Sequence, residues 1–209
     1  MPIQVIVFDC DGVLLDSVDV KTRAFASLFA EHGPEAVEFI VAYHLANGGV
    51  SRYAKFAHFY RKRLGREITE AESKTLDKRF TAACLDALLK APMIPGAREF
   101  LAANPGGRPL YVCSGAPELE LAFIFDHMDL TGHFKAIYGS PTPKAENLAR
   151  IVAECGAPAD EVLMVGDSGT DLDAALRVGA RFLGVGEFPA PHDWMPDLTG
   201  LAGYLERIG

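Results

Sequence analysis

The 209-residue sequence has only four cysteines, and it lacks the long apolar or basic runs that mark several classes of protein. No stretch reaches the roughly 18 to 20 apolar residues that a membrane-spanning helix needs. The amino terminus, MPIQVIVFDC, has no basic flank before a long apolar segment, so a secretory signal is not expected. The formal net charge of −8 comes without a run of Lys or Arg, which argues against a nucleic acid or an anionic membrane as partner.

The cysteines show no spacing typical of a metal site or of a disulfide framework. Cys10, Cys84, Cys113 and Cys155 include no C-x-x-C pair and no nearby pair of histidines. We therefore expect small core residues and a cytoplasmic location. Hydrophobic residues make up 49% and charged residues 23% of the chain, a balance that favours a folded domain over a disordered one.

Short apolar runs alternate with helical patterns through most of the chain. Strands are predicted at residues 3–8, 109–113, 136–138, 162–165 and 181–185, and helices at residues 117–127, 145–154 and 172–178. Such alternation predicts an α/β fold built on a doubly wound parallel sheet.

One stretch, residues 16–90, contains helical patterns but no strand pattern. Its segments 18–33, 34–49 and 50–65 place apolar residues at helical spacing, and each ends in glycine. Segment 69–91 opens with Thr69 and Glu72, the capping-box pattern of a helix start. We therefore predict an α/β core formed by residues 1–15 and 91–209, and an inserted helical cap formed by residues 16–90.

The core carries its reactive side chains at predicted strand ends, where an open parallel sheet places its ligand site. These residues are Asp9 and Asp11 in FDCDG, Ser114 and Gly115 in CSGAP, Lys144 in PTPKAEN, and Asp167 and Asp171 in GDSGTDLDAA. Taken singly, each has a plainer interpretation as a turn, cap or surface residue. Their joint order along the chain favours one shared site.

Crowded carboxylates need a cation, and several carboxylate oxygens with room for water suit Mg²⁺. Ser114, the backbone amides after it and Lys144 suit the oxygens of a phosphoryl group. One carboxylate can attack phosphorus and form an aspartyl-phosphate. A second can protonate the leaving alcohol and then accept a proton from water, and we expect its neighbour's charge to raise its pKa.

These four segments resemble the sequence motifs of the haloacid dehalogenase-like hydrolases, a superfamily composed mainly of phosphatases. The resemblance covers essentially the whole chain and implies a Rossmann-like core with a cap inserted after the first motif. It implies Asp9 as the nucleophile and Asp11 as the general acid and base. The other implied roles are phosphate binding by Ser114, charge balance by Lys144, and Mg²⁺ binding by the Asp9 side chain, the Asp11 backbone carbonyl and Asp167, supported by Asp171.

Three differences between this sequence and the motifs of individual subfamilies narrow the range of expected activities. Asp11 is present, whereas haloacid dehalogenases lack this second aspartate, so dehalogenation is not expected. Lys21 stands about where β-phosphoglucomutases carry a histidine, which leaves a phosphomutase as the weaker alternative. No cap lysine matches the context of the Schiff-base lysine of phosphonatases. The expected activity is Mg²⁺-dependent hydrolysis of a small phosphorylated metabolite.

Two alternatives lie outside catalysis. Receiver domains of signalling proteins also combine an acidic cluster, a hydroxyl and a lysine on a parallel sheet. They are much shorter, however, and their phosphorylated aspartate does not follow the first strand within D-x-D. The other alternative is a phosphate-binding protein that has lost turnover.

The stretch HLANGGVSRYAKF is the most site-like part of the predicted cap. Arg52 and Lys55 follow its glycine pair, and either could bind a carboxylate or a second phosphate of the substrate. A turn followed by a solvated helix face is the plainer alternative. Asp16 and Ser17 are expected to cap the first cap helix, with a role in substrate binding as the alternative. His44 and His58 are expected to pack beside aromatic residues. Whether the protein is a monomer or a dimer stays open.

Overall fold

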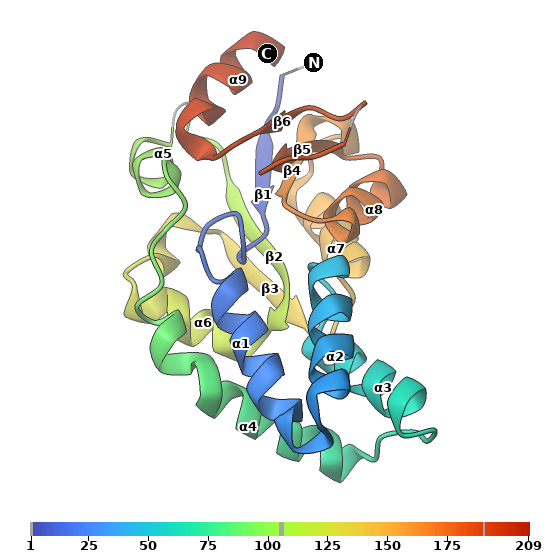
Figure 1. Cartoon of the computed structure of the whole chain (residues 1–209). Coiled ribbons are helices and arrows are strands. Elements are labelled where there is room, and N and C mark those ends of the chain that lie inside the picture. Colours follow the sequence, from blue (N-terminus) through green and yellow to red (C-terminus); the bar gives the residue numbers. More distant parts are fainter. Residues whose placement is uncertain (1, 105–106, 190) are drawn as a thin grey trace.

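The computed structural model describes residues 2–104, 107–189 and 191–209. Its described part contains a six-stranded, all-parallel sheet in the order β3-β2-β1-β4-β5-β6 (Figure 1). The strands are β1 (Val5–Phe8), β2 (Leu110–Pro117), β3 (Ala136–Ser140), β4 (Val162–Gly166), β5 (Arg181–Val185) and β6 (Trp194–Met195). The strand order reverses between β1 and β4, the point at which such sheets bind ligands. The predicted doubly wound parallel sheet is confirmed.

Helices cover both faces of this sheet because side chains along each strand alternate between them. Val5 and Val7 of β1 pack with α7 (Lys144–Cys155) and α8 (Gly169–Val178). Ile6 and Phe8 belong to the other core cluster, which contains α5 (Ala97–Ala103), α6 (Glu118–His127) and α9 (Leu201–Ile208). Single 3₁₀ turns are η1 (Ala30–His32), η2 (Thr131–His133), η3 (Ala159–Glu161) and η4 (Leu198–Gly200).

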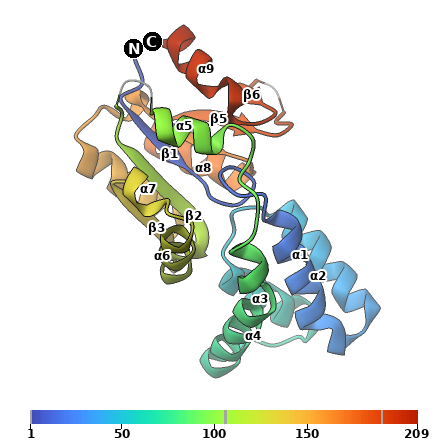
Figure 2. The same cartoon turned by 90° about the vertical axis from the view of Figure 1, so that its left-hand side faces the viewer.

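Four helices follow β1 and lie together at one end of the sheet (Figures 1 and 2). They are α1 (Val18–Phe29), α2 (Pro34–Ala46), α3 (Arg52–Arg63) and α4 (Glu70–Leu88), and we call them the cap. Buried phenylalanines hold them together: the ring centroids of Phe29 and Phe59 are 4.1 Å apart, and those of Phe25 and Phe80 are 4.6 Å apart. Thr69 and Glu72 form the predicted capping box at the start of α4.

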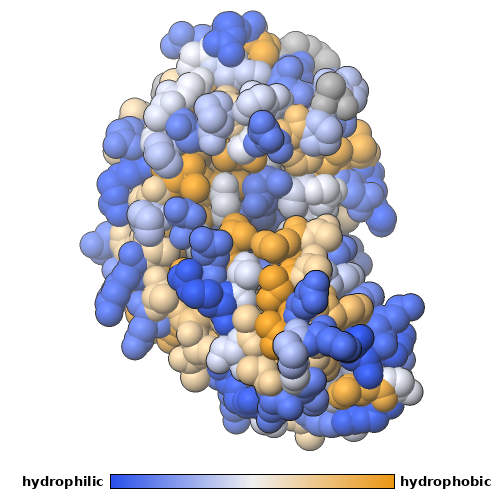
Figure 3. Space-filling view, viewed as in Figure 1, coloured by the Kyte–Doolittle hydropathy of each residue, from blue (hydrophilic) through white to orange (hydrophobic). Residues whose placement is uncertain are grey.

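Figure 3 shows hydrophilic side chains over much of one face, with apolar ones gathered near its middle, where α1 and α2 meet the core. Across the residues that the structure describes, no helix is long and apolar enough to span a membrane. Both chain termini lie at the end of the molecule away from the cap (Figure 2).

Candidate active site

Asp9 follows β1 directly and is buried at its carboxyl end, with 2% of its surface exposed. The backbone amide of Cys10 donates a hydrogen bond of 2.7 Å to Oδ1, and the Lys144 ammonium lies 2.9 Å from Oδ2. Burial raises the pKa of Asp9 to about 6. The charges of Asp171 and Asp11 raise it further, and the charge of Lys144 lowers it. Both oxygens of this carboxylate are therefore held in place by donors.

Lys144, the first residue of α7, joins two carboxylates, since its ammonium also pairs with Asp171 at 2.5 Å. Asp171 is wholly buried and accepts hydrogen bonds from the Ser168 amide at 3.1 Å and the Ser168 hydroxyl at 2.5 Å. The bond from the Ser168 amide is part of the capping box that starts α8. Because its oxygens are occupied by protein donors, Asp171 anchors Lys144 beside Asp9.

Asp167 follows β4 and is the least partnered carboxylate of the site. Within the described ranges, no side chain or amide donates a hydrogen bond to it and no base pairs with it. Burial, with Asp9 and Asp171 nearby, raises the pKa of Asp167 to about 8. The chain after β1 approaches it closely: at Gly12, where φ is +76°, a Cβ would lie 2.2 Å from Asp167 Oδ2, so only glycine fits there.

Asp9, Asp167 and Asp171 each offer an oxygen within 4.8 Å of the others. Lys144 brings one positive charge against these three carboxylates, and the raised pKa values of Asp9 and Asp167 show that the cluster resists full ionisation. A bound divalent cation would relieve this repulsion, and an all-oxygen donor set suits a hard ion. The residues present therefore fit a metal ion.

Asp11 faces the cap, and two donors hold its carboxylate. The Ser17 hydroxyl donates to Oδ1 at 2.5 Å, and the Lys21 ammonium pairs with Oδ2. Burial raises the pKa of Asp11, but Lys21 and Ser17 outweigh burial and hold it below its ordinary value. The prediction of a raised pKa is therefore wrong. Ser17 stands at the N-cap position of α1, as predicted, but its hydroxyl makes no capping hydrogen bond and donates to Asp11 instead.

Ser114 lies inside β2, which runs past the predicted end to Pro117. Val112 pairs with Phe8, so Ser114 and Asp9 stand at the same end of adjacent strands. Ser114 is 1% exposed, and its hydroxyl accepts a hydrogen bond of 3.3 Å from the Ala116 amide. The structure thus brings Ser114 to the predicted edge of the sheet.

The turn between α2 and α3 sits directly on this edge. The Thr170 hydroxyl donates a hydrogen bond of 2.8 Å to the Gly48 carbonyl. Gly49 has φ +71°, and a Cβ there would lie 2.0 Å from Thr170 Oγ1. A Cβ on Gly115 would lie 2.0 Å from the Gly49 carbonyl oxygen, so two glycines allow the cap and the core to touch.

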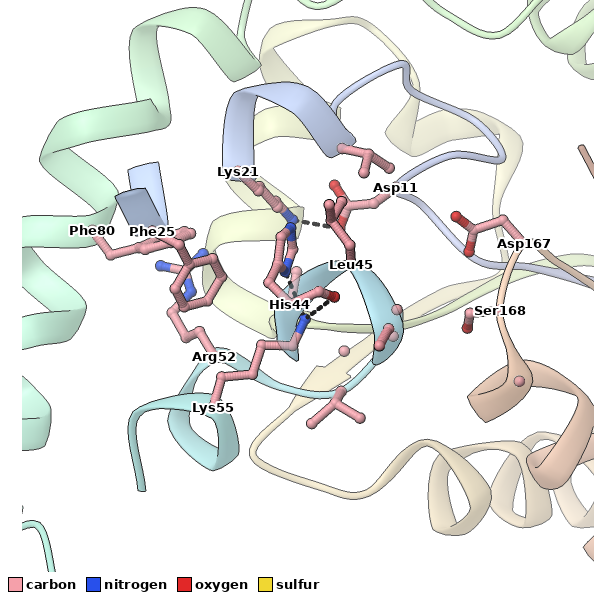
Figure 4. A pocket seen from close by; sticks show the side chains of 18 residues that line it. Asp11, Lys21, Phe25, His44, Leu45, Arg52, Lys55, Phe80, Asp167 and Ser168 are labelled. Carbon is pink, nitrogen blue, oxygen red and sulfur yellow. Dashed lines mark hydrogen bonds and ion pairs between the residues drawn. The ribbon is translucent and has the colours of Figure 1, made fainter. Parts of the chain in front are cut away.

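A cavity of about 260 Å³ lies between the cap and the core (Figure 4). Its core wall includes Asp11, Asp167 and Ser168, and its cap wall includes Lys21, His44 and Lys55. Figure 4 shows the cap side chains across the cavity from Asp167 and Ser168.

Arg52 and Lys55 also line this cavity, in different surroundings. The Arg52 guanidinium pairs with Asp77 at 3.3 Å and with Glu120, and it donates to the Thr81 hydroxyl at 2.9 Å. The Lys55 ammonium lies 2.8 Å from His44 Nδ1. Both side chains are buried, so the alternative of a solvated helix face does not apply to them.

The sequence interpretation missed Ser17, Lys21 and His44 as cavity or site residues. A signal existed for two of them, because Ser17 and Lys21 are four positions apart at a helix start and so share the face that reaches Asp11. His44 gave no such signal. The packing expected for His58 is confirmed, since its ring stacks on Tyr43 with centroids 3.7 Å apart.

The sequence matches the family model of the haloacid dehalogenase-like hydrolases over residues 3–179. The chain belongs to this family. A phosphoglycolate phosphatase of Mesorhizobium japonicum is 30% identical over 189 residues, which cover 87% of this chain and 82% of that protein. A 5′-nucleotidase of Pseudomonas aeruginosa is 29% identical over 217 residues, with 96% and 95% covered. A solved structure of a hydrolase from Pseudomonas syringae has a TM-score of 0.77 at 23% identity, over 99% of each chain.

Membership of the haloacid dehalogenase-like hydrolases confirms the resemblance inferred from the four motifs, and with it the prediction of a hydrolase. The curated relatives are phosphatases and a nucleotidase, which agrees with the predicted hydrolysis of a phosphate monoester. Their names differ in the alcohol that leaves. The relatives' names therefore do not identify the leaving group of this chain's substrate, which depends on the residues of its own cavity.

Proposed function

We propose that the protein is a Mg²⁺-dependent phosphatase that acts on a small phosphorylated metabolite through an aspartyl-phosphate on Asp9. The observation that carries the proposal is the buried Asp9–Lys144–Asp171 arrangement beside the unpartnered Asp167. Asp9, Asp167 and the backbone carbonyl of Asp11 would hold Mg²⁺, with Asp171 in support. When bound, the ion would neutralise negative charge on the carboxylates and the phosphoryl oxygens.

In the first half of the reaction, a carboxylate oxygen of Asp9 forms a bond to phosphorus while the bond to the leaving oxygen breaks. Lys144 holds the nucleophile and balances charge, and Ser114 with the Gly115 amide would bind phosphoryl oxygens. Asp11 gives its proton to the leaving alcohol. The anionic substrate favours the protonated form of Asp11, because it adds negative charge beside that carboxyl.

In the second half, Asp11 accepts a proton from water as the water oxygen attacks phosphorus and the bond to Asp9 breaks. This step releases phosphate and restores the Asp9 carboxylate. Ser17 and Lys21 stabilise the ionised form of Asp11 that the step requires, which is consistent with their contacts to both of its oxygens.

The cap, for which we keep the predicted bounds 16–90, would close over the substrate and exclude water. The cavity of about 260 Å³ is smaller than the roughly 300–1,000 Å³ of typical ligand pockets. Phosphoglycolate, which the names of several relatives specify, is small enough to suit it, whereas a nucleoside monophosphate is a much larger ligand. A small phosphorylated acid or sugar is therefore the preferred substrate class, and a cytoplasmic location remains a prediction from composition.

Phosphate release from a panel of phosphorylated acids, sugars and nucleotides, with Mg²⁺, tests this proposal. We expect turnover of a few small compounds and a loss of at least about a thousand-fold in Asp9→Asn. Asp173→Asn is the matched control, because Asp173 is exposed on α8 and pairs with Arg177. Absence of phosphate release, or equal activity of both variants, would contradict the proposal. A rearranged phosphate ester without free phosphate would indicate a phosphomutase.

A further inference from the structure

Four lysine and arginine side chains are buried in the part of the chain that the structure describes: Lys21, Arg52, Lys55 and Lys144. Three of them pair with carboxylates: Lys21 with Asp11, Arg52 with Asp77 and Glu120, and Lys144 with Asp9 and Asp171. Lys55 is different. It forms no ion pair with any described carboxylate, although only 3% of its surface is exposed.

The Lys55 ammonium is held by neutral groups. It donates to His44 Nδ1 at 2.8 Å and to the His44 carbonyl at 3.5 Å, and it lies 5.6 Å from the centre of the Phe25 ring. An ammonium has three donors, so these contacts leave capacity for another acceptor. Burial and the charge of Lys21 lower the pKa of Lys55 to about 8, in spite of Asp11, Asp167 and Asp9. A buried cation in this position lacks its counter-ion.

His44 is suited to orient this ammonium. An ammonium has no lone pair and can only donate, so in this contact Nδ1 acts as the acceptor of a neutral ring. Burial, with Lys55 and Lys21 nearby, lowers the pKa of His44 to about 4, so the ring remains an acceptor at neutral pH. Phe25 packs against the imidazole with ring centroids 4.7 Å apart, which fixes its place in the cap.

We propose that Lys55, oriented by His44, binds an anionic group on the leaving part of the substrate, a carboxylate or a second phosphate. This inference rests on the proposed phosphatase function. Lys55 lines the same cavity as Asp11 and Asp167, so an anion bound to it would belong to a molecule whose phosphoryl group lies at the core wall (Figure 4). Arg52 does not take this role, because Asp77 and Glu120 already neutralise its guanidinium.

Three matched substrates test the proposal: phosphoglycolate, which carries a carboxylate, ethanediol bisphosphate, which carries a second phosphate, and hydroxyethyl phosphate, which carries neither. We expect the wild-type protein to have a higher kcat/KM for at least one anionic compound than for the neutral one. Which anionic compound is preferred identifies the group that Lys55 binds. In Lys55→Met, the ratio of the anionic to the neutral kcat/KM should fall about 10- to 100-fold, as expected for loss of a charge-assisted hydrogen bond.

Lys62→Met is the matched control, because Lys62 is exposed on the same helix and lies outside the cavity. Its substrate ratio should equal that of the wild type. Lys55→Met should also remain folded, with a Tm at or above that of the wild type, because it removes a buried charge without a counter-ion.

A Lys55→Met variant that loses activity equally on all three compounds would overturn the proposal, as would a wild type without preference for an anionic leaving group. In both cases the phosphatase function would stand, because phosphate is still released. A wild type that releases phosphate from members of the broader panel but from none of these three would overturn this inference alone, whereas failure on the whole panel would overturn the phosphatase function as well.

Discussion

The Arg52 guanidinium on α3 and the Glu120 carboxylate on α6 form a buried ion pair that joins the cap to the core. Their side chains are 4% and 7% exposed, and the Thr81 hydroxyl bridges them by donating to Glu120. The guanidinium also lies over the Phe80 ring, 4.4 Å from its centre. Arg52 therefore links the cap to the core, and this pairing explains why its guanidinium, although on the cavity wall, is not available to a substrate.

Removing the charge of Glu120 should weaken this contact. In Glu120→Gln, Arg52 keeps Asp77 but loses its core partner, and we expect the free energy of unfolding to fall by about 1–3 kcal/mol. The control is Glu67→Gln, which breaks the exposed Arg61–Glu67 pair and should leave the free energy of unfolding nearly unchanged. Urea unfolding of both variants measures the difference. Equal midpoints would show that burial adds nothing to the Arg52–Glu120 pair.

Gly49→Ala should lower kcat/KM by more than its loss of folding stability can account for. Alanine at φ +71° is strained, and its Cβ would meet Thr170 Oγ1, which pushes the α2–α3 turn away from the core. Gly65→Ala is the matched control, since Gly65 has φ +66° with nothing within 4 Å of a Cβ. Both variants should lose about 1–2 kcal/mol of stability from backbone strain. Only Gly49→Ala should also lose about 10-fold or more in kcat/KM, and equal losses would exclude a steric role for the turn.

The core of the site was predictable because its residues lie at, or a few residues after, the carboxyl end of a predicted strand, and strands are visible as short apolar runs. The cap was less predictable, because its chemistry depends on distant partners. Whether Arg52 is free depends on Glu120, 68 positions along the chain, and the pKa of Asp11 depends on Lys21, ten positions away. No local pattern contains the Arg52–Glu120 pairing, whereas the helical spacing of Ser17 and Lys21 was the one local signal for the contacts of Asp11.

Some elements of the fold escaped prediction for a different reason. Helices Ala97–Ala103 and Leu201–Ile208 are about two turns long, too short for a clear helical period. The strand Trp194–Met195 has only two residues, and its pairing with β5 defines it more than its sequence does. The five longer strands carried enough apolar residues for their places to be found.

Asp167→Asn should stabilise the metal-free protein and remove its response to Mg²⁺. A carboxyl whose pKa is raised by folding, here to about 8, destabilises the fold progressively as pH rises from about 4 to about 8. Asparagine removes this effect, so Tm at pH 8 in EDTA should rise by at least about 2 °C, the shift expected for roughly 1 kcal/mol in a chain of this size.

Mg²⁺ should raise the Tm of the wild type and of the control Asp173→Asn, but not that of Asp167→Asn. Thermal melts with Mg²⁺ and with EDTA provide the measurement. An Asp167→Asn protein that melts at a lower temperature than the wild type in EDTA would contradict the repulsion among the carboxylates. A Tm of this variant that still rises with Mg²⁺ would contradict the assignment of Asp167 as a ligand.

His44 should make the protein less stable in mild acid. Its pKa is about 4 in the folded protein against an ordinary 6.5, so the unfolded chain binds more protons between these two values. The neutral ring therefore contributes its full stabilisation above pH 6.5, and this contribution to the free energy of unfolding declines by about 1–3 kcal/mol as pH falls toward 4.

His44→Asn keeps an acceptor for Lys55 and cannot titrate. Urea unfolding of the two proteins from pH 7 to pH 4 should give curves that converge as pH falls, because only the wild type loses this contribution. Parallel curves would mean that His44 takes up its proton as readily in the folded cap as in the unfolded chain.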